Sequence, residues 1–357
     1  MTIQQDTLSL PAIDLAPFLE DPSSEAAHIE CQKAAESLMK YSCLAIRDPR
    51  VVNADHETFL DLLEAYFSLP TEEKMKDVRP ELSYQVGATP GLTEVPKCGS
   101  DEPCQEFVAN LNEQDKPSDY NGPDPKWRFF WRMGERPTNT QFPEQNAAPV
   151  VPAAFPQWPV VLNKWGNTLM NAISSFSEML ALGLGLDRST FLDKATNGPH
   201  LLAPTATDLG KYGAVGTVLA GFHYDLNFLT IHGRSRFPGL IIWDAEGNKR
   251  VVKIPEGCLL VQAGKQMEVL TGGNIKAGYH EVVVLPQTLD VLERRKEQGQ
   301  PLWRISSTLF FHLASDVTLK PMSSIEKVAD NYKVWKDMKV GEFVKRELGL
   351  ISLAADN

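Results

Sequence analysis

The sequence has little cysteine and no long apolar segment. Its five cysteines are odd in number and show no C-x-x-C spacing, which argues against a disulfide framework or a zinc ribbon and predicts reduced thiols. No run approaches the roughly 20 apolar residues of a membrane-spanning helix. The first residues, MTIQQDTLSLPAIDL, lack the basic start and apolar centre of a signal peptide. We therefore expect a cytoplasmic protein with no membrane partner.

Basic residues are also in short supply. The chain has 35 Lys and Arg against 46 Asp and Glu, for a formal charge of −11 and a pI near 5.2. Because nucleic-acid binding depends on clustered Lys and Arg, we expect no nucleic-acid partner and favour a small-molecule one. A length of 357 residues with 43% apolar content is enough for a well-packed core. The composition does not indicate an oligomeric state.

The first half of the chain predicts helices around an irregular stretch. Apolar spacing of three and four predicts helices over 25–42 and 55–70, with Asp55 as a plausible N-cap, and a long helix over 162–180. Twelve of the 25 prolines lie between Pro90 and Pro159. Proline breaks helices and removes ladder donors, so this stretch should be irregular, with short strands over a surface or pocket.

From about residue 200 the pattern changes to some eight short β-rich runs separated by turns, one of them MEVLTGG. Such spacing predicts a sandwich or barrel, most commonly a jelly roll. We therefore predict an α+β chain with a double-stranded β-helix (jelly roll) core, flanked by N-terminal helices, a long backing helix and C-terminal helices. The expected divisions are a mixed region at 1–199, the core at 200–320 and a helical tail at 321–357.

The run GFHYDLNFLTIHG (221–233) places an imidazole and an acid two residues apart in an apolar segment. Residues two apart in a strand share a face, so His223 and Asp225 point the same way. Burying an unpaired carboxylate costs free energy, and a metal ion would stabilise it by binding both the carboxylate and the imidazole. The alternative is a structural pair in which the two side chains are hydrogen-bonded. His280 begins a later strand and is the expected third ligand. Two histidines and a carboxylate on one face leave positions open, as in non-haem Fe(II) oxygenases.

A second polar pair lies in WRISSTLFF. Arg304 and Ser306 are also two residues apart, among Leu309, Phe310 and Phe311. A desolvated guanidinium without an anion is costly, and its planar fork matches a carboxylate. We therefore expect a carboxylate ligand near the metal, with an ion pair to an internal acid as the alternative.

These motifs resemble, in order, those of the 2-oxoglutarate/Fe(II)-dependent oxygenase superfamily, in its isopenicillin N synthase-like group. The similarity covers HxD, a distal His and RxS, and extends to LPAIDL, CLAI and SLPTEEK near the N-terminus. It implies His223, Asp225 and His280 as iron ligands and Arg304 with Ser306 as the carboxylate clamp. It further implies Fe(II), O2 and 2-oxoglutarate, with hydroxylation, desaturation or cyclisation of a small metabolite through a ferryl intermediate.

Three features depart from the family pattern. The interval from His280 to Arg304 is long, because LPQTLDVLERRKEQGQP inserts a charged, helix-like excursion. Lys265 stands where relatives often carry Asp, and HLLAPT (200–205) lacks a tyrosine that many relatives use to bind co-substrate or substrate. The last departure keeps open an Fe(II)-dependent oxidase that binds the substrate's own carboxylate on Arg304 and Ser306. A non-catalytic jelly roll that binds a metal or small acid is a further alternative.

Substrate contacts are expected from the proline-rich stretch and the terminal helix, on position alone. The residues predicted are Tyr84, Phe107, Trp131 and Phe343. His232 and His312 are expected to be core or surface histidines rather than ligands.

Overall fold

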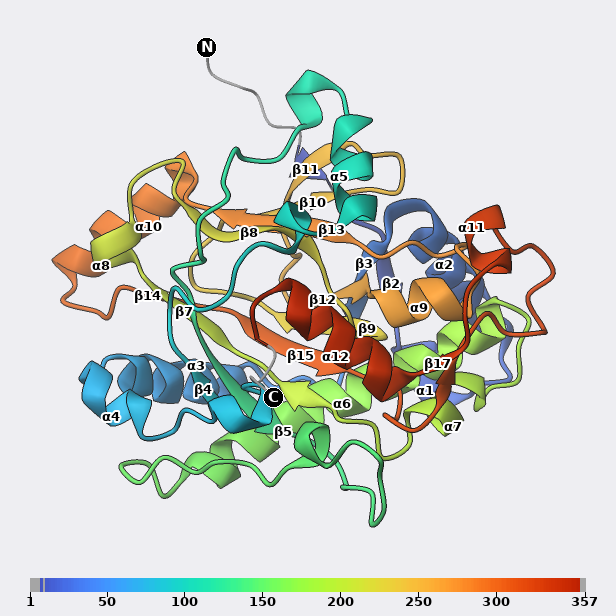
Figure 1. The fold of residues 1–357 in the computed structure, drawn as a ribbon, viewed down its shortest axis with the longest axis horizontal. Helices are drawn as coiled ribbons and strands as arrows, with labels where there is room; N and C mark the ends of the chain where they lie inside the picture. The colour runs from blue at the N-terminus through green and yellow to red at the C-terminus, as the bar shows by residue number, and fades with distance from the viewer. Residues whose placement is uncertain (1–6, 9, 354–357) are drawn as a thin grey trace.

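The computed structural model describes residues 7–8 and 10–353, and its core is a pair of β-sheets (Figure 1). The smaller sheet has the order β1 (Thr7–Leu8), β11 (Lys249–Val252), β10 (Leu240–Trp243), β13 (Tyr279–Val283) and β8 (Val218–Tyr224). The larger has the order β14 (Trp303–Ile305), β7 (Thr205–Asp208), β5 (Trp127–Arg132), β6 (Leu201–Leu202), β15 (Ser307–Phe311), β9 (Leu229–Gly233), β12 (Cys258–Ala263), β3 (Cys43–Arg47) and β2 (Ala12–Asp14), with β4 (Gly87–Thr89) on β5. A short pair joins β16 (Thr318–Leu319) to β17 (Met338–Lys339).

Apolar side chains from both sheets share one cluster, which shows that the sheets face each other. Ile242 from the smaller sheet packs with Ala45 and Leu260 from the larger one. Nearly all pairings are antiparallel, and Gly247, at φ +87°, closes the predicted hairpin turn between β10 and β11. The predicted jelly-roll core is confirmed.

Helices back the outer face of the larger sheet. The main ones are α6 (Trp158–Gly183), α2 (Glu25–Tyr41) and α3 (Asn53–Phe67), and their buried faces belong to the principal apolar core. The other helices are α1 (Ala16–Glu20), α4 (Thr71–Met75), α5 (Glu102–Ala109), α7 (Thr190–Ala195), α8 (Leu209–Tyr212), α9 (Lys265–Leu270), α10 (Pro286–Glu297), α11 (Asp330–Lys333) and α12 (Val340–Leu350). Short 3-10 turns span Pro80–Leu82, Lys97–Gly99, Glu113–Asp115 and Pro143–Asn146.

The long backing helix and the excursion before Arg304 are confirmed as α6 and α10. In Figure 1 α10 lies beside α8 at one end of the molecule, and α12 crosses in front of the larger sheet. Leu292 of α10 packs in one cluster with Leu209 of α8 and with Phe237. The terminal helices are α11 and α12, as expected.

Some local predictions are wrong. MEVLTGG was expected as a strand, but most of it belongs to helix α9, whose side chains Met267, Val269 and Leu270 pack inward. The apolar residues are spaced for either structure, and the i,i+3 pair of Lys265 with Glu268 favours the helix. Helix α3 begins at Asn53, so Asp55 lies in its first turn rather than at its N-cap.

The expectation of five reduced thiols is also wrong. Cys98 and Cys104 form a disulfide, while Cys31, Cys43 and Cys258 are free and buried. The cytoplasmic location therefore stays a prediction. Across residues 7–8 and 10–353, every helix is too short or too polar to cross a bilayer. The three-part division of the chain also stays a prediction. Strands β2, β3 and β5 of the expected first part lie in the same sheet as strands of the expected core.

Candidate active site

Three side chains predicted to hold a metal meet at the end of β8. Strand β13 pairs antiparallel with β8 and places His280 opposite His223, 57 residues earlier in the chain. The Nε2 atoms of His223 and His280 lie 3.9 and 4.0 Å from Oδ1 of Asp225. One potential ligand atom from each residue lies within 4.8 Å of the others. The jelly roll thus brings the three side chains together.

Hydrogen bonds to the remaining polar atoms orient this triad. Nδ1 of His223 lies 2.7 Å from the Gly221 carbonyl, and Nδ1 of His280 lies 3.2 Å from that of Gly278. Each Nδ1–H can donate to its carbonyl, which leaves both Nε2 lone pairs free. Thr230 donates to Oδ2 of Asp225 at 2.6 Å and leaves Oδ1 free. Two imidazole nitrogens and one carboxylate oxygen suit Fe(II), so the donor set fits the expected metal.

The surroundings favour the protonation states that bind a cation. Burial, followed by the charge of His280, lowers the pKa of His223 to about 3. Burial acts to raise the pKa of Asp225, but the imidazoles of His280 and His223 outweigh it and keep that pKa below its ordinary value. At neutral pH His223 is therefore neutral and Asp225 ionised, as metal ligation requires.

Arg304 lies on β14 with 8% of its surface exposed. Its Nε donates to the Pro238 carbonyl at 3.3 Å. It forms no ion pair with any acid in the described part of the chain, so the alternative of an internal partner is not seen. Burial alone lowers its pKa to about 10. A buried guanidinium without an acidic partner can form an ion pair with an anionic ligand.

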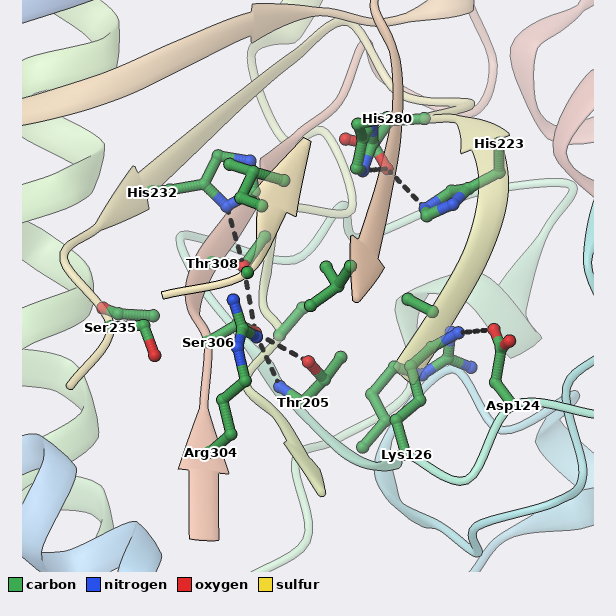
Figure 2. Close-up of a pocket in the computed structure, with 18 of the residues that line it drawn as sticks. Asp124, Lys126, Thr205, His223, His232, Ser235, His280, Arg304, Ser306 and Thr308 are labelled. Carbon is green, nitrogen blue, oxygen red and sulfur yellow. Dashed lines mark hydrogen bonds and ion pairs between the residues drawn. The ribbon is translucent and has the colours of Figure 1, made fainter. Parts of the chain in front are cut away.

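Ser306 follows directly, at the junction between β14 and β15. Its Oγ accepts from the Thr205 amide at 2.9 Å and lies 2.8 Å from Oγ1 of Thr205. Thr205 belongs to HLLAPT (200–205), the segment that lacks the tyrosine expected from the family pattern. On the neighbouring strands Thr308 donates to Ser306 and lies 2.9 Å from Nδ1 of His232. Figure 2 shows this polar row on the wall of the pocket opposite His223.

One cavity of about 600 Å³ joins the two groups. The triad, Arg304 and Ser306 all line it. Lys265, which departs from the family pattern, pairs with Glu268 at 2.8 Å and does not line the cavity. His232 and His312 line the cavity as well, but both are held by neighbouring side chains, His232 between Thr308 and Gln262. The cavity therefore contains a metal-competent end and an anion-competent wall.

A buried charged cluster near His223 was not foreseen. Lys126 pairs with Asp124 and, at 3.1 Å, with Glu94, while Arg128 reaches Glu94 at 2.9 Å. Asp124 also accepts from the Gly221 amide at 2.9 Å, which fixes the cluster to β8. All four side chains line the cavity, and Figure 2 shows Asp124 and Lys126 on the His223 side. Alternate charges in DPKWR were the available signal, but the proline-rich context obscured it.

The four predicted substrate residues do not reach the cavity. Phe107 stacks on Tyr279 at 4.3 Å, behind β13, and Trp131 is buried with its Nε1 on Asn163. Phe343 is fully buried in the core, and Tyr84 packs at the core's edge. Their neighbours do line the cavity: Gln85, Phe130, Glu347 and Leu348. The sequence located the right segments, but side-chain direction there depends on irregular backbone.

Sequence comparisons match this chain to one enzyme superfamily. Residues 207–313 match the model of the 2OG-Fe(II) oxygenase superfamily. The 2-oxoglutarate-dependent dioxygenase citB of Monascus ruber is 21% identical over 292 residues, 77% of this chain and 80% of that protein.

Solved structures share the fold over nearly the whole chain. A 2OG-Fe(II) oxygenase family protein of Caulobacter crescentus aligns with TM-score 0.74 and 22% identity, covering 96% of this chain and 99% of the other. Neurospora crassa T7H with alpha-KG aligns with TM-score 0.71 and 16% identity, covering 97% and 98%. T7H has also been solved with alpha-KG and thymine. Residues 207–313 thus carry the sequence pattern of the 2OG-Fe(II) oxygenase superfamily, whose members use Fe(II), 2-oxoglutarate and O2, and the jelly roll and the triad are consistent with that match.

Proposed function

We propose that His223, Asp225 and His280 hold Fe(II) and that Arg304 with Ser306 holds the distal carboxylate of 2-oxoglutarate. The observation that carries this proposal is the buried guanidinium of Arg304, which has no acidic partner in the described chain and lines the same cavity as the triad. Its planar fork can bind a carboxylate with two hydrogen bonds. When bound, iron and 2-oxoglutarate supply the oxidising chemistry, in which O2 is consumed and succinate and CO2 are released.

The chain's own residues position these groups. The carbonyls of Gly221 and Gly278 fix the rings of His223 and His280, and Thr230 fixes the carboxylate of Asp225. Around the clamp, the oxygen of Ser306 accepts from the Thr205 amide and from Thr308. Its hydroxyl proton is then available to Thr205 Oγ1 or to a bound carboxylate. The burial of Arg304 excludes competing water and strengthens its bonds to that carboxylate.

The substrate is a small organic molecule bound at the charged cluster. Nη1 of Arg128 is taken by Glu94, but Nε and Nη2 of Arg128 are buried and meet no acceptor among the described residues. These two nitrogens form one edge of the fork, which suits a carbonyl or carboxylate oxygen. Val95 and Pro96 line the same cavity and offer apolar surface to such a molecule. T7H with thymine is a relative with a bound molecule of this class. Assignment to the isopenicillin N synthase-like group is part of the same proposal.

Calorimetric titration tests the clamp. The full chain is loaded with Fe(II) without oxygen, and 2-oxoglutarate is titrated into the native protein, Arg304→Gln and the matched control Arg128→Gln. We expect Arg304→Gln to lose about 100-fold or more in affinity, since removing one partner of a buried charged bond costs about 2–5 kcal/mol. Arg128→Gln should stay within about twofold. Native-like binding by Arg304→Gln would contradict the proposal.

Product analysis separates the alternative functions. Thr205 in place of a tyrosine is the one observation that favours an oxidase with the substrate carboxylate on Arg304. Such an oxidase would take up O2 with substrate and no 2-oxoglutarate. The proposed function instead requires succinate from 2-oxoglutarate, measured against a panel of small carbonyl compounds and carboxylic acids. A non-catalytic binding protein would neither take up O2 nor form succinate.

A further inference from the structure

Two loops and helix α10 line the cavity at the end of the barrel away from the triad, and their exposed side chains indicate a second opening there. Strand β8 runs toward the triad and β9 runs back, so the loop 234–239 lies at the opposite end. The same argument places 253–257, after β11, and α10, after β13, at that end. Residues of all three segments line the same cavity as the triad. We call this opening the far mouth and define it by Arg234, Lys253 and Arg294 with the apolar side chains Leu240, Val252 and Val291.

The far mouth is positively charged. Arg234, Lys253 and Arg294 are exposed and line the cavity, and none forms an ion pair within the described chain. The acids that line the cavity are Glu94, Asp124, Asp225 and Glu347, and none of them belongs to the three far-end segments. The acids of these segments, Glu256, Asp290, Glu293 and Glu297, do not line the cavity, so the charged lining at this end is positive in a chain of net charge −11.

Acids of helix α3 form ion pairs with two other arginines at the far end of the barrel. Arg236 binds Asp61 at 2.6 Å and Glu64 at 2.9 Å on α3, and Arg295 binds Glu64 at 2.9 Å. These bonds hold the loop 234–239 and α10 against the helical layer. Arg294, next to Arg295, comes from the insertion that lengthens the interval between His280 and Arg304. The inserted helix is thus fixed in the position that brings a cation to the mouth.

The far mouth leads to the clamp. Ser235 donates to the Ile305 carbonyl at 2.7 Å, and Arg304 donates to the Pro238 carbonyl, so the loop 234–239 is bonded to the strand that carries the guanidinium. Figure 2 shows Ser235 on the Arg304 side of the pocket, away from His223. An anion that enters past Arg234 therefore meets Arg304 before it meets the triad.

We propose that 2-oxoglutarate enters, and succinate leaves, through the far mouth, and that Arg234, Lys253 and Arg294 steer these dianions. This inference rests on the proposed clamp at Arg304. Long-range repulsion from a chain of net charge −11 is screened beyond about 8 Å at physiological salt, whereas cations inside the opening act within that distance. Clefts lined by one sign of charge raise association rates of oppositely charged ligands by about 10-fold or more. The organic substrate then has the opposite end, beside Val95 and Arg128, to itself.

The steering is tested by association kinetics. Binding of 2-oxoglutarate to the Fe(II)-loaded full chain is followed without oxygen by stopped-flow tryptophan fluorescence, at 20 to 300 mM KCl. The variant carries Arg234→Gln, Lys253→Gln and Arg294→Gln, and the control has the same net charge through three exposed cations elsewhere, Arg136→Gln, Lys327→Gln and Lys336→Gln. We expect the variant to bind about 10-fold more slowly at low salt with a flattened salt dependence, and the control to behave as native. Equal rates in the variant and the control would overturn the steering.

The route is tested by narrowing each opening separately. Val252→Trp narrows the far mouth and Val95→Trp narrows the opposite end. A barrier on the route slows entry and exit by the same factor and leaves the dissociation constant unchanged. We expect this pattern in Val252→Trp, at about 10-fold or more, and native rates in Val95→Trp. The reverse pattern would overturn the far-mouth route, whereas a native chain that fails to bind 2-oxoglutarate would instead refute the clamp.

Discussion

Replacing Arg304 by methionine should make the ligand-free chain more stable while strongly weakening its binding of 2-oxoglutarate. Burial lowers the Arg304 pKa from 12.5 to about 10, and no acid offsets that effect. This difference corresponds to about 3 kcal/mol of destabilisation of the charged, folded form at neutral pH. Methionine removes that cost and keeps an apolar side chain of similar length. Losing the hydrogen bond to the Pro238 carbonyl destabilises the variant by about 1 to 2 kcal/mol. The expected net increase in the free energy of unfolding is therefore about 1–2 kcal/mol.

Urea unfolding at pH 7, followed by tryptophan fluorescence, measures this gain in protein freed of metal and 2-oxoglutarate. A parallel titration measures 2-oxoglutarate affinity, which should fall about 100-fold or more in Arg304→Met. Saturating 2-oxoglutarate should stabilise the native chain by about 2.7 kcal/mol at 100 times its dissociation constant, and the same concentration should stabilise the variant by about 0.4 kcal/mol or less. If Arg304→Met unfolds at lower urea than the native chain, the guanidinium is satisfied internally and the reasoning fails.

Three further predictions concern the metal, a buried acid and the disulfide. Asp225→Ala should abolish Fe(II) binding in equilibrium dialysis, and retained turnover would contradict the ligand assignment. Glu94 has its pKa lowered to about 2 because Lys126 and Arg128 outweigh the effect of burial; Glu94→Gln should therefore lose about 3 kcal/mol at pH 7. That loss should shrink below pH 4.5 and vanish near pH 2 in urea titrations, and a pH-independent difference would argue against the charge effect. Reducing the Cys98–Cys104 bond, which closes a short loop, should lower the unfolding free energy by about 2 kcal/mol, and no change with dithiothreitol would show that the loop is already ordered.

The pairs of polar residues that lie two apart in a strand could be predicted, because alternate residues of a strand point to the same face. His223 with Asp225 and Arg304 with Ser306 were therefore expected on shared faces, and the short β-rich runs indicated the jelly roll that brings His280 to His223. The same periodicity failed at 267–273, where helix α9 buries Met267 and Val269.

The charged cluster could not be predicted because its contacts are distant in sequence and lie in irregular backbone. Glu94 and Lys126 are 32 residues apart, and no periodic element connects them. Tyr84 and Phe107 were chosen by position alone, and both face away from the cavity that Gln85 lines. Where proline removes regular structure, a one-residue change reverses which side chain points inward.

The triad and Arg304 stand on different sheets. His223 and His280 belong to the five-stranded sheet, whereas Arg304 belongs to β14 at the edge of the larger one. Packed sheets lie about 10 Å apart, and that gap is set by the whole interior rather than by any loop. With the clamp proposed at Arg304, the separation of the sheets sets the length of acid that can reach both ends, so an acid with one carbon fewer or one more than 2-oxoglutarate should bind more weakly.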